Sequence, residues 1–217
     1  MTDTTTLPPL TTIQPKNYPS ASKLLAECFH DNPAHQYFCR NPMAIKKELA
    51  WLLGLNLKLQ LAHGADSFCL TEDDTTKAMG FWTYPNLVKV GLWQQIKGGL
   101  LRIPFKMGII ALKRILEVGD GIDAHLHRAM GTTQSYYYLN NMVVEPTWQS
   151  KGLGSKILQK EFEKIAIQEK NAVLALSTQR YWTVKFYQRL GFEIILEDKI
   201  GSDELAFTNW TMKKILP

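Results

Sequence analysis

The stretch Tyr137–Ile157, which reads YYLNNMVVEPTWQSKGLGSKI, decides the fold of this chain. Residues 137–144 are rich in aromatic and β-branched residues and are broken only by Asn140 and Asn141, a pattern typical of a strand buried on both faces. Beyond Pro146, apolar residues recur at the spacing of a helix with one buried face, namely Ile157, Leu158, Phe162, Ile165 and Ala166. Residues 149–154, QSKGLG, are therefore expected at the N-terminus of a helix that follows a buried strand.

Two glycines of this segment, Gly152 and Gly154, suit a phosphate-binding helix N-terminus. The first turn of a helix leaves backbone N–H groups unpaired and carries the positive end of the peptide dipoles. Glycine lets a ligand approach the main chain, and Lys151 adds positive charge. A Gly-x-Gly loop can also start a helix without binding anything, and neither a Rossmann nor a Walker pattern is present. The segment alone leaves both interpretations open.

The wider pattern resembles the GNAT family of acyl-CoA N-acyltransferases. In that family a hydrophobic strand ends in a V-x-P-like step, a glycine-containing loop opens a helix, and a second strand precedes a helix that ends in Y-x-x-x-G-F. The corresponding segments here are Val144-Glu145-Pro146, Gln149 to Gly154, Ala172 to Ser177, and Tyr187 to Phe192. The resemblance is strong over 136–192, weaker over 13–85, and absent as a motif between 85 and 130.

The resemblance implies an α/β fold with a mixed, mostly antiparallel central sheet that is flanked by helices on both faces. It implies a single domain over residues 13–217 and a helical insertion, residues 85–130, between the third and fourth strands. In the family this location commonly helps to shape the acceptor pocket. Residues 1–12 are rich in Thr and Pro and lack periodicity, so we expect a disordered tail there.

The resemblance also implies the donor, acetyl-CoA, and the residues that bind it. The strand edge at Met142, Val143 and Val144 would pair with the pantetheine arm through its backbone. An N–H group near Val143 or Val144 could polarise the thioester carbonyl. The pyrophosphate would lie on the loop at the start of the helix, formed by Gln149, Ser150, Lys151, Gly152, Leu153, Gly154 and Ser155. Ser150 stands where the family usually has Gly, and its small side chain should be tolerated.

Tyr187 corresponds to the family's common general acid, a phenol that protonates the departing thiolate of CoA. A phenol with a pKa near 10 stays protonated at neutral pH and can donate. Helical spacing alone favours a different role, a core tyrosine beside Phe186 and Leu190. Arg180 stands where the family often has Asn, and we expect it to contact the phosphates; Thr183 stands where Ala is frequent.

No residue stands out as the general base. Tyr136 occupies the position where some family members carry a strand glutamate. His125 and His127 titrate in a suitable range, but isolated histidines beside an insertion are more often surface residues. A water relay or an already neutral amine are the remaining alternatives.

Composition and charge limit the fold and function classes that fit this chain. The 217 residues are 45% hydrophobic and 11% aromatic, enough for one sizeable core. The formal net charge of +5 favours an anionic ligand, and coenzyme A with its phosphates qualifies. Cys28, Cys39 and Cys69 have no metal-binding spacing, so we expect reduced, buried thiols and no metal. No signal peptide or membrane-spanning stretch is recognisable, which fits the cytoplasm.

Further elements follow from local patterns. We expect a short strand near Ile13, a helix over 19–29 and a second helix that starts at Asn41-Pro42. Strands are expected at 67–72, 78–84, 193–197 and 205–213, and a helix at 180–190. Pro104 and Gly98-Gly99 should divide the insertion into at least two helices. We expect the apolar side of these helices to pack on the core and the bases to be solvated.

Three function classes remain. The leading hypothesis is an N-acetyltransferase that transfers the acetyl group of acetyl-CoA to a primary amine of a small molecule or a protein by direct attack. The second is a non-catalytic acyl-CoA-binding sensor. The third is a protein that uses the basic insertion to bind a membrane or nucleic acid. Under the leading hypothesis we expect no nucleic-acid partner and no stable membrane insertion, and a homodimer is possible.

Overall fold

The computed structural model describes residues 8–85, 87, 90, 94, 96, 98–131 and 134–217. Its strands are β1 (Asp66–Glu72), β2 (Thr75–Thr83), β3 (Tyr137–Val144), β4 (Val173–Thr178), β5 (Glu193–Ile200) and β6 (Phe207–Ile215). Its α-helices are α1 (Tyr18–Phe29), α2 (Pro33–Phe38), α3 (Ile45–Ala62), α5 (Ile103–Met107), α6 (Ile109–Met130), α7 (Leu153–Gln168) and α8 (Tyr181–Arg189). Short 3-10 helices are η1 (Pro15–Asn17), η2 (Leu100–Arg102) and η3 (Pro146–Trp148).

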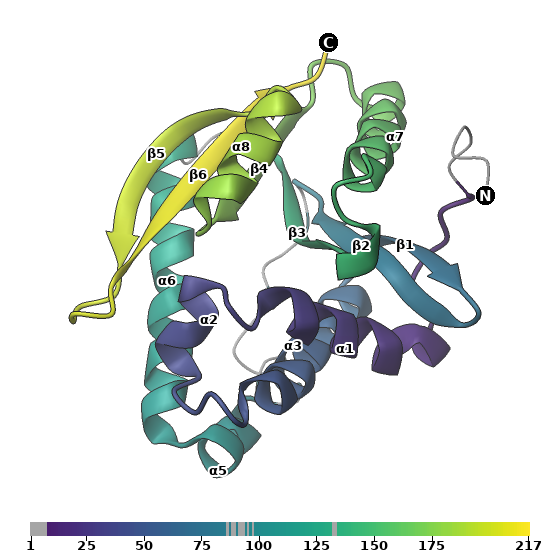
Figure 1. Cartoon of the computed structure of the whole chain (residues 1–217). Helices are drawn as coiled ribbons and strands as arrows, with labels where there is room; N and C mark the ends of the chain where they lie inside the picture. Colours follow the sequence, from purple (N-terminus) through teal and green to yellow (C-terminus); the bar gives the residue numbers. More distant parts are fainter. Residues whose placement is uncertain are drawn as a thin grey trace.

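The six strands form one sheet in the order β1-β2-β3-β4-β6-β5. Every neighbouring pair is antiparallel except β3 and β4. These two parallel strands pair only at Tyr137 with Leu174 and at Tyr138 with Ala175. Beyond these pairs they diverge (Figure 1), so the middle of the sheet is split toward the C-terminal ends of β3 and β4.

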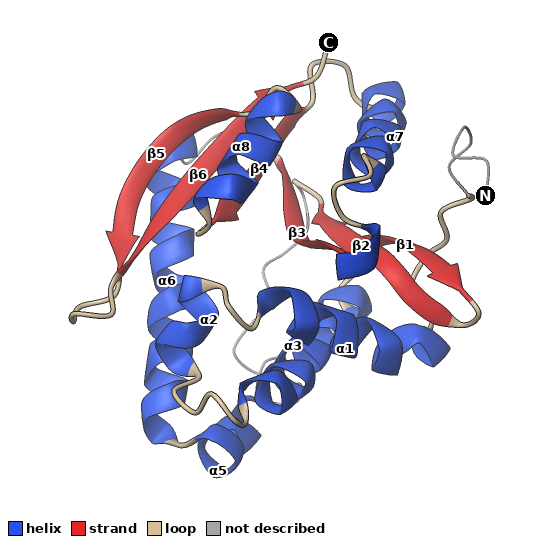
Figure 2. Cartoon of the chain, viewed as in Figure 1, coloured by secondary structure: helices blue, strands red, loops and turns tan. Residues whose placement is uncertain are grey.

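Helices cover both faces of the sheet (Figure 2). On one face α1, α2 and α3 pack with side chains of β1 and β2, including Leu25, Leu49 and Phe81. On the other face α7 and α8 pack on the sheet through Ile157, Leu158 and Val184 among others. The predicted fold class, a mixed and mostly antiparallel sheet between helical layers, is confirmed.

The segment that decided the prediction folds as expected. The structure has β3 at the predicted residues, and α7 begins at Leu153, directly after the QSKG residues. The predicted strand and helix that follow appear as β4 and α8, each within a residue or two of the expected bounds. The β1–β2 and β5–β6 hairpins also lie where the turn residues indicated.

The predicted strand near Ile13 is absent. Thr11 makes a single antiparallel bridge with Cys69, with backbone bonds in both directions, and the chain then turns into η1. The insertion therefore lies between the second and third strands of the observed sheet. Residues 1–7 of the expected tail lie outside the described residues.

Two helix starts differ from the prediction. Asn41 accepts from the Met43 amide in a preceding turn, so α3 begins at Ile45 rather than at Pro42. The sequence analysis did not predict α2, whose first turn is capped by Asn32 through the Ala34 amide. Its six residues are too few to show helical periodicity. The pair Asn32-Pro33, a cap followed by proline, is a local signal for this helix that the sequence analysis did not use.

The insertion contains α5 and α6, but Pro104 lies in the first turn of α5 and the break falls at Gly108. The prediction for its apolar side is wrong in part. Ala111 and Val118 are buried, yet Leu101, Phe105, Ile109 and Ile110 are 62%, 94%, 67% and 67% exposed. A surface that combines these side chains with Arg102, Lys106 and Lys113 is unusual for a packed helical insertion.

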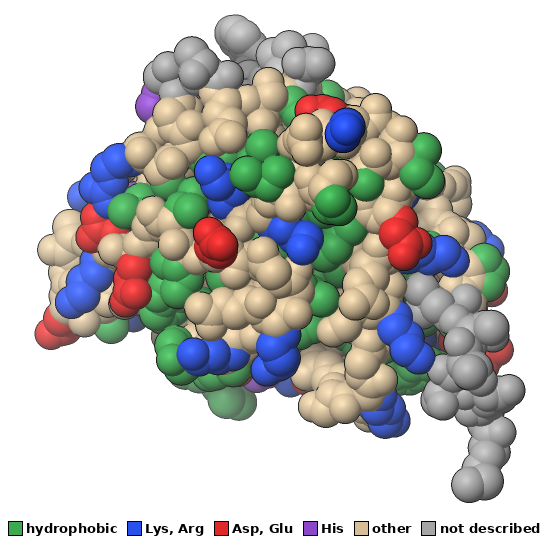
Figure 3. All heavy atoms as spheres, turned by 90° about the horizontal axis from the view of Figure 1, so that it is seen from above, with side chains coloured by type: hydrophobic (Ala, Val, Ile, Leu, Met, Phe, Trp, Pro, Cys, Tyr) green, Lys and Arg blue, Asp and Glu red, His purple; other side chains and the backbone are tan. Residues whose placement is uncertain are grey.

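Among the described residues, another face of the molecule has no cluster of one charge sign (Figure 3). Figure 3 shows Lys and Arg side chains interspersed with Asp and Glu on the face seen from above. Cys28, Cys39 and Cys69 are free thiols, as predicted; Cys39 and Cys69 are buried, whereas Cys28 is only half-buried. None of the helices within the described ranges has both the length and the apolar content that crossing a bilayer requires.

Candidate active site

A cavity of about 190 Å³ lies where β3 and β4 diverge. Its wall comes from α2 and the turn before it, from β3, from the end of β4 and from α8. The lining residues include Asn32, His35, Tyr138, Asn141, Met142, Ser177, Gln179, Arg180, Thr183 and Tyr187. Segments that are distant in the sequence thus meet at the split in the sheet.

Buried polar atoms without partners gather on this cavity. His35 Nδ1, Asn141 Nδ2 and Arg180 Nε have no hydrogen-bond partner within the described structure, and all three residues line the cavity. A buried polar group without a partner is costly, so such groups are rare in native proteins. Their concentration at one cavity is typical of a site whose polar ligand supplies the missing bonds.

A bulge in β3 produces one of these groups. Met79 pairs with Val143 and Phe81 with Asn140, so Gly80 of β2 lies opposite two residues of β3, Asn141 and Met142. Asn141 has a φ of 49°, in the left-handed region that asparagine tolerates better than most residues. A bulge of this kind bends the strand and redirects its backbone groups. Both bulge residues, Asn141 and Met142, line the cavity.

The predicted phosphate loop has the expected form. Gly152 is the N-cap of α7 with a φ of 76°, and Ser150 has a φ of 60°. The first i→i−4 bond of α7 runs from Lys156 N to Gly152 O, so the amides of residues 153–155 precede the ladder. A Cβ added at Gly152 would meet nothing within 4 Å, which leaves open space beside these amides. A diphosphate fits such a loop.

Side-chain hydrogen bonds and packing contacts hold this loop against the C-terminal end of β3. Gln149 Nε2 donates to Val144 O at 2.8 Å, and Cys28 Sγ donates to the same oxygen at 3.3 Å. A Cβ at Gly154 would lie 3.4 Å from Phe186 Cζ and 3.5 Å from Val144 Cγ2. The structure therefore brings together Val144, Gln149 and Gly154 as predicted, but the Val144 carbonyl is already occupied.

Tyr187 combines both roles considered from the sequence. It is 6% exposed, and its ring contacts Phe186 and Phe192 at centroid distances of 5.1 and 5.6 Å, so it is part of the core. It also lines the small cavity. Burial, and secondarily the nearby Tyr138, raise the pKa of Tyr187 above its usual value. The phenol therefore stays protonated at neutral pH and can donate a proton into the cavity.

Arg180 is the N-cap residue of α8 and is held by α1 and the residues after it. Its Nη1 donates to Cys28 O at 3.0 Å, and Nη2 pairs with Asp31. These bonds connect α1 to the end of β4, on the rim of the gap. Its role toward phosphates stays a prediction.

The histidines differ from the expectation. His125 is buried, not a surface residue, and its Nδ1 lies 3.2 Å from Asn209 Nδ2; it lines neither described cavity. His127 is exposed, as expected. The sequence analysis missed His35, which stacks on Phe29 with ring centroids 5.2 Å apart. Burial, followed by the charge of Arg180, lowers the pKa of His35 to about 3, so the imidazole is neutral.

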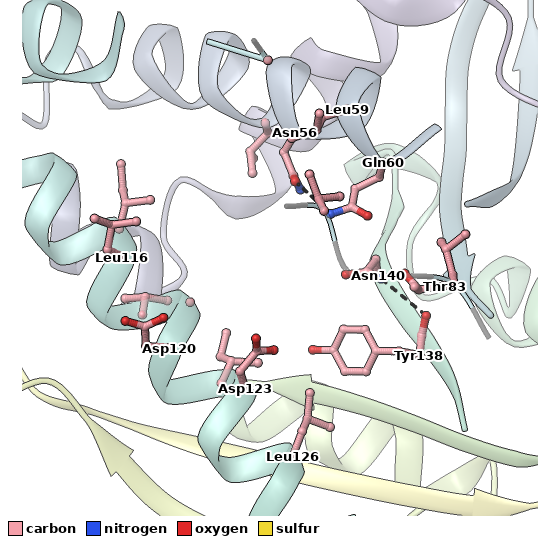
Figure 4. Close-up of a pocket in the computed structure, with 18 of the residues that line it drawn as sticks. Asn56, Leu59, Gln60, Thr83, Leu116, Asp120, Asp123, Leu126, Tyr138 and Asn140 are labelled. Carbon is pink, nitrogen blue, oxygen red and sulfur yellow. Dashed lines mark hydrogen bonds between the residues drawn. The ribbon is translucent and has the colours of Figure 1, made fainter. Parts of the chain in front are cut away.

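A larger cavity, of about 760 Å³, lies beside the first. It is formed by α3, α6, the start of β3 and residues 98–103. Tyr136 lines it, and Figure 4 shows the Tyr138 hydroxyl pointing toward the Asp123 carboxylate. The sequence analysis named neither Asp120 nor Asp123, because a carboxylate on an insertion helix carries no motif.

The profile of the GNAT acetyltransferase domain family matches residues 111–194, from α6 to the start of β5. This part of the chain is therefore similar to GNAT acetyltransferase domains. This match confirms the enzyme class that the motifs predicted, an acyl-CoA-dependent acetyltransferase. No protein with a curated sequence matches the chain at a significant level.

Solved structures of acetyltransferases share this GNAT fold over nearly the whole chain. One, a histone acetyltransferase HPA2 and related acetyltransferase from Corynebacterium glutamicum, is 15% identical with a TM-score of 0.63, covering 96% of each chain. An arylalkylamine N-acetyltransferase from Aedes aegypti is 15% identical with a TM-score of 0.56, covering 96% and 99%. A polyamine N-acetyltransferase from Drosophila melanogaster is 12% identical with a TM-score of 0.55, covering 96% and 100%.

The described part of the chain has no group of three or more His, Cys, Asp or Glu side chains arranged to hold a metal ion. Acetyl-CoA fits the residues that are present. The open amides at α7 suit its diphosphate, and the unpartnered Nδ2 of Asn141 and Nε of Arg180 suit carbonyl oxygens at the split.

Proposed function

We propose that this protein is an N-acetyltransferase that uses acetyl-CoA to acetylate a primary amine. One observation carries the proposal: the unpartnered polar atoms of His35, Asn141 and Arg180 surround the cavity at the β3–β4 split, next to Tyr187. The diphosphate would lie at the α7 N-terminus, the pantetheine arm along β3 from Val144 to Met142, and the thioester beside Tyr187. Two of the similar structures are acetyltransferases of amines, an arylalkylamine and a polyamine.

The thioester is already activated, so positioning and proton transfer are what this chain must supply. The acceptor amine first loses a proton to water. Its lone pair then forms the C–N bond at the thioester carbonyl, and the C–S bond breaks with its electron pair on sulfur. The Tyr187 hydroxyl donates its proton to that sulfur, and the proton released by the new amide nitrogen restores the phenol. No covalent enzyme intermediate is needed.

Three results separate the proposal from its alternative. Calorimetry should detect acetyl-CoA binding, and a thiol reagent should detect CoA release when a panel of primary amines is added. Mass spectrometry should identify the acetylated amine. Binding without thiol release across alkyl, aralkyl, diamine and peptide acceptors would favour the non-catalytic sensor. Failure to bind acetyl-CoA would overturn both.

The free cysteines support a location for this activity. Thiols that remain unpaired are typical of a reducing compartment. Cys28, whose pKa burial raises to about 12, is an unreactive thiol. We infer a cytoplasmic enzyme, and targeted localisation of a tagged full-length chain tests this.

A second candidate function rests on the exposed apolar side chains Leu101, Phe105, Ile109 and Ile110, which lie among three bases. Such a surface suits an anionic bilayer, which takes up apolar side chains and attracts lysine and arginine. We expect the protein to sediment with vesicles of phosphatidylcholine and phosphatidylglycerol at physiological salt.

The double variant Phe105→Ser, Ile109→Ser should lose this binding, whereas Ile167→Ser, which removes an 87% exposed side chain of α7, should keep it. Binding that disappears above low salt would indicate unspecific charge attraction. If the parent forms a dimer and the double variant is a monomer, the surface is instead an interface between two copies of the chain.

A further inference from the structure

The larger cavity has the size of a small-molecule site. Its volume of about 760 Å³ falls within the range of roughly 300–1,000 Å³ that such sites occupy. Its wall comes from α3, α6 and β3, which lie on different sides of it (Figure 4). The insertion that carries no family motif therefore supplies much of the wall.

The two cavities are neighbours. Phe38, Val118, Ile122, Tyr138 and Asn140 line both of them. The Tyr138 ring is thus shared between the small cavity, which contains Tyr187, and the large one. Electrostatic coupling between Tyr138 and Tyr187 agrees with this proximity. A molecule in the large cavity can place one end at the β3–β4 split from the side opposite to α8.

Among the described residues that line the large cavity, the charged ones are Asp120 and Asp123. Both are on α6, within an insertion whose charged residues from 89 to 114 are all basic. Asp123 faces the Tyr138 hydroxyl in Figure 4 and adds, after burial, to the causes that raise the pKa of Tyr138 to about 12. The end of the cavity nearest the split therefore favours a cation.

Much of the remaining wall is aliphatic, although Asn56, Gln60, Thr83, Gln134, Ser135 and Asn140 also line the cavity. Aliphatic side chains of α3, η2, α5 and α6 face the cavity, namely Leu52, Leu53, Leu55, Leu59, Leu100, Ile103, Ile115, Leu116 and Leu126. The aliphatic part of the wall stabilises apolar groups.

We propose that the acceptor is a small primary amine on an extended apolar body, such as a long alkylamine or an aralkylamine. Its ammonium group lies between Asp123, Asp120 and Tyr138, and its apolar part lies against the leucines of α3 and the 98–103 segment. This inference rests on the proposed function for the transfer step, but binding of the amine does not depend on it.

A homologous series of n-alkylamines tests the apolar wall. Affinity, measured by calorimetry without acetyl-CoA, should rise roughly threefold to fourfold per added methylene until the cavity is filled. A diamine of equal length, which places a second charge against the leucines, should bind much more weakly. The same order should appear in kcat/KM when acetyl-CoA is present.

Two variants test the charged end and the wall. Asp123→Asn should weaken amine binding on the order of tenfold, because the ammonium loses a charged partner. Leu116→Arg, at a half-exposed wall position, should exclude the amine by charge and volume. Glu163→Gln, which removes an exposed carboxylate of α7 remote from both cavities, is the matched control and should bind like the parent. All three should bind acetyl-CoA normally.

The outcomes separate the two proposals. Turnover of peptide or short polar amines with no preference for apolar ones would overturn the acceptor class while keeping the acetyltransferase. Amine binding that follows chain length and depends on Asp123, without turnover, would support the site and count against the transfer reaction. Amine binding that Asp123→Asn and Leu116→Arg leave unchanged would overturn the site.

Discussion

The proposed donor side and the proposed acceptor side of this protein are built from different kinds of groups. The donor side, from β3 to α8, is one continuous stretch in which glycines, a bulge and a helix N-terminus present main-chain groups. The acceptor side is a wall of side chains from α3, α6 and β3, which are far apart in the sequence. Main-chain sites leave local sequence patterns, whereas side-chain walls assembled from distant elements do not. The variants below should therefore affect one side and spare the other.

The largest effect is expected for Tyr187→Phe, which removes the hydroxyl and keeps the ring between Phe186 and Phe192. If Tyr187 is the general acid, kcat should fall by about 10²–10⁴-fold while acetyl-CoA and amine both bind normally. Steady-state turnover and thermal melting on one preparation measure this. Parental turnover would leave Tyr187 as a core residue and would transfer the acid's role to water.

The second-largest effect is expected on CoA affinity, from substitutions at Gly152 in the proposed phosphate loop. Gly152→Val strains the left-handed backbone of the loop, and Gly152→Glu adds a negative charge beside the diphosphate. We expect Gly152→Glu to bind CoA about tenfold more weakly than Gly152→Val. Amine affinity should not change in either variant. Equal CoA binding by both folded variants and the parent would contradict the phosphate-loop assignment.

A smaller effect should follow from Asn141→Gly. Glycine adopts the φ of 49° easily and lacks the unpartnered Nδ2, so the bulge is kept and one donor is lost. Loss of one hydrogen bond to the donor should lower kcat/KM for acetyl-CoA roughly threefold to tenfold. Circular dichroism should show the parental fold, and unchanged kcat/KM would remove Asn141 from the site.

The smallest effect is expected in the pH dependence of the free energy of unfolding, through His35, which lines the small cavity. Burial lowers the pKa of His35 from 6.5 to about 3. Between these values the unfolded chain binds a proton at His35 that the folded protein does not, so stability falls as the pH decreases below about 6.5. The slope from this one group is at most about 1.4 kcal/mol per pH unit.

His35→Phe should flatten this dependence, since phenylalanine can stack on Phe29 without titrating. Urea unfolding at several pH values between 7 and 4 measures it. His127→Gln removes an exposed histidine and is the control that should keep the parental slope. Identical slopes for the parent and His35→Phe would show that His35 ionises freely in the folded protein.

The elements that form the proposed donor side were predicted well because each has a local cause. The start of α7 was expected from the glycine-containing residues 149–154, and β3 from its apolar run. Errors arose where tertiary contacts decide. His125 is buried with its Nδ1 beside Asn209 of β6, and Thr11 pairs with Cys69 of β1 in a bridge too short to register as a strand pattern.

The sequence by itself determined the fold class, the position of the glycine-containing loop before α7 and a candidate for the acid, because these depend on periodicity, glycine conformation and a spaced motif. Only the tertiary structure decided that β3 and β4 separate after two pairs, and that His35, Asn141 and Arg180 meet there without partners. It also decided that Asp123 of the insertion faces Tyr138. Such juxtapositions follow from how α3, α6 and the sheet pack together, and packing between distant segments leaves no periodic signal in the chain.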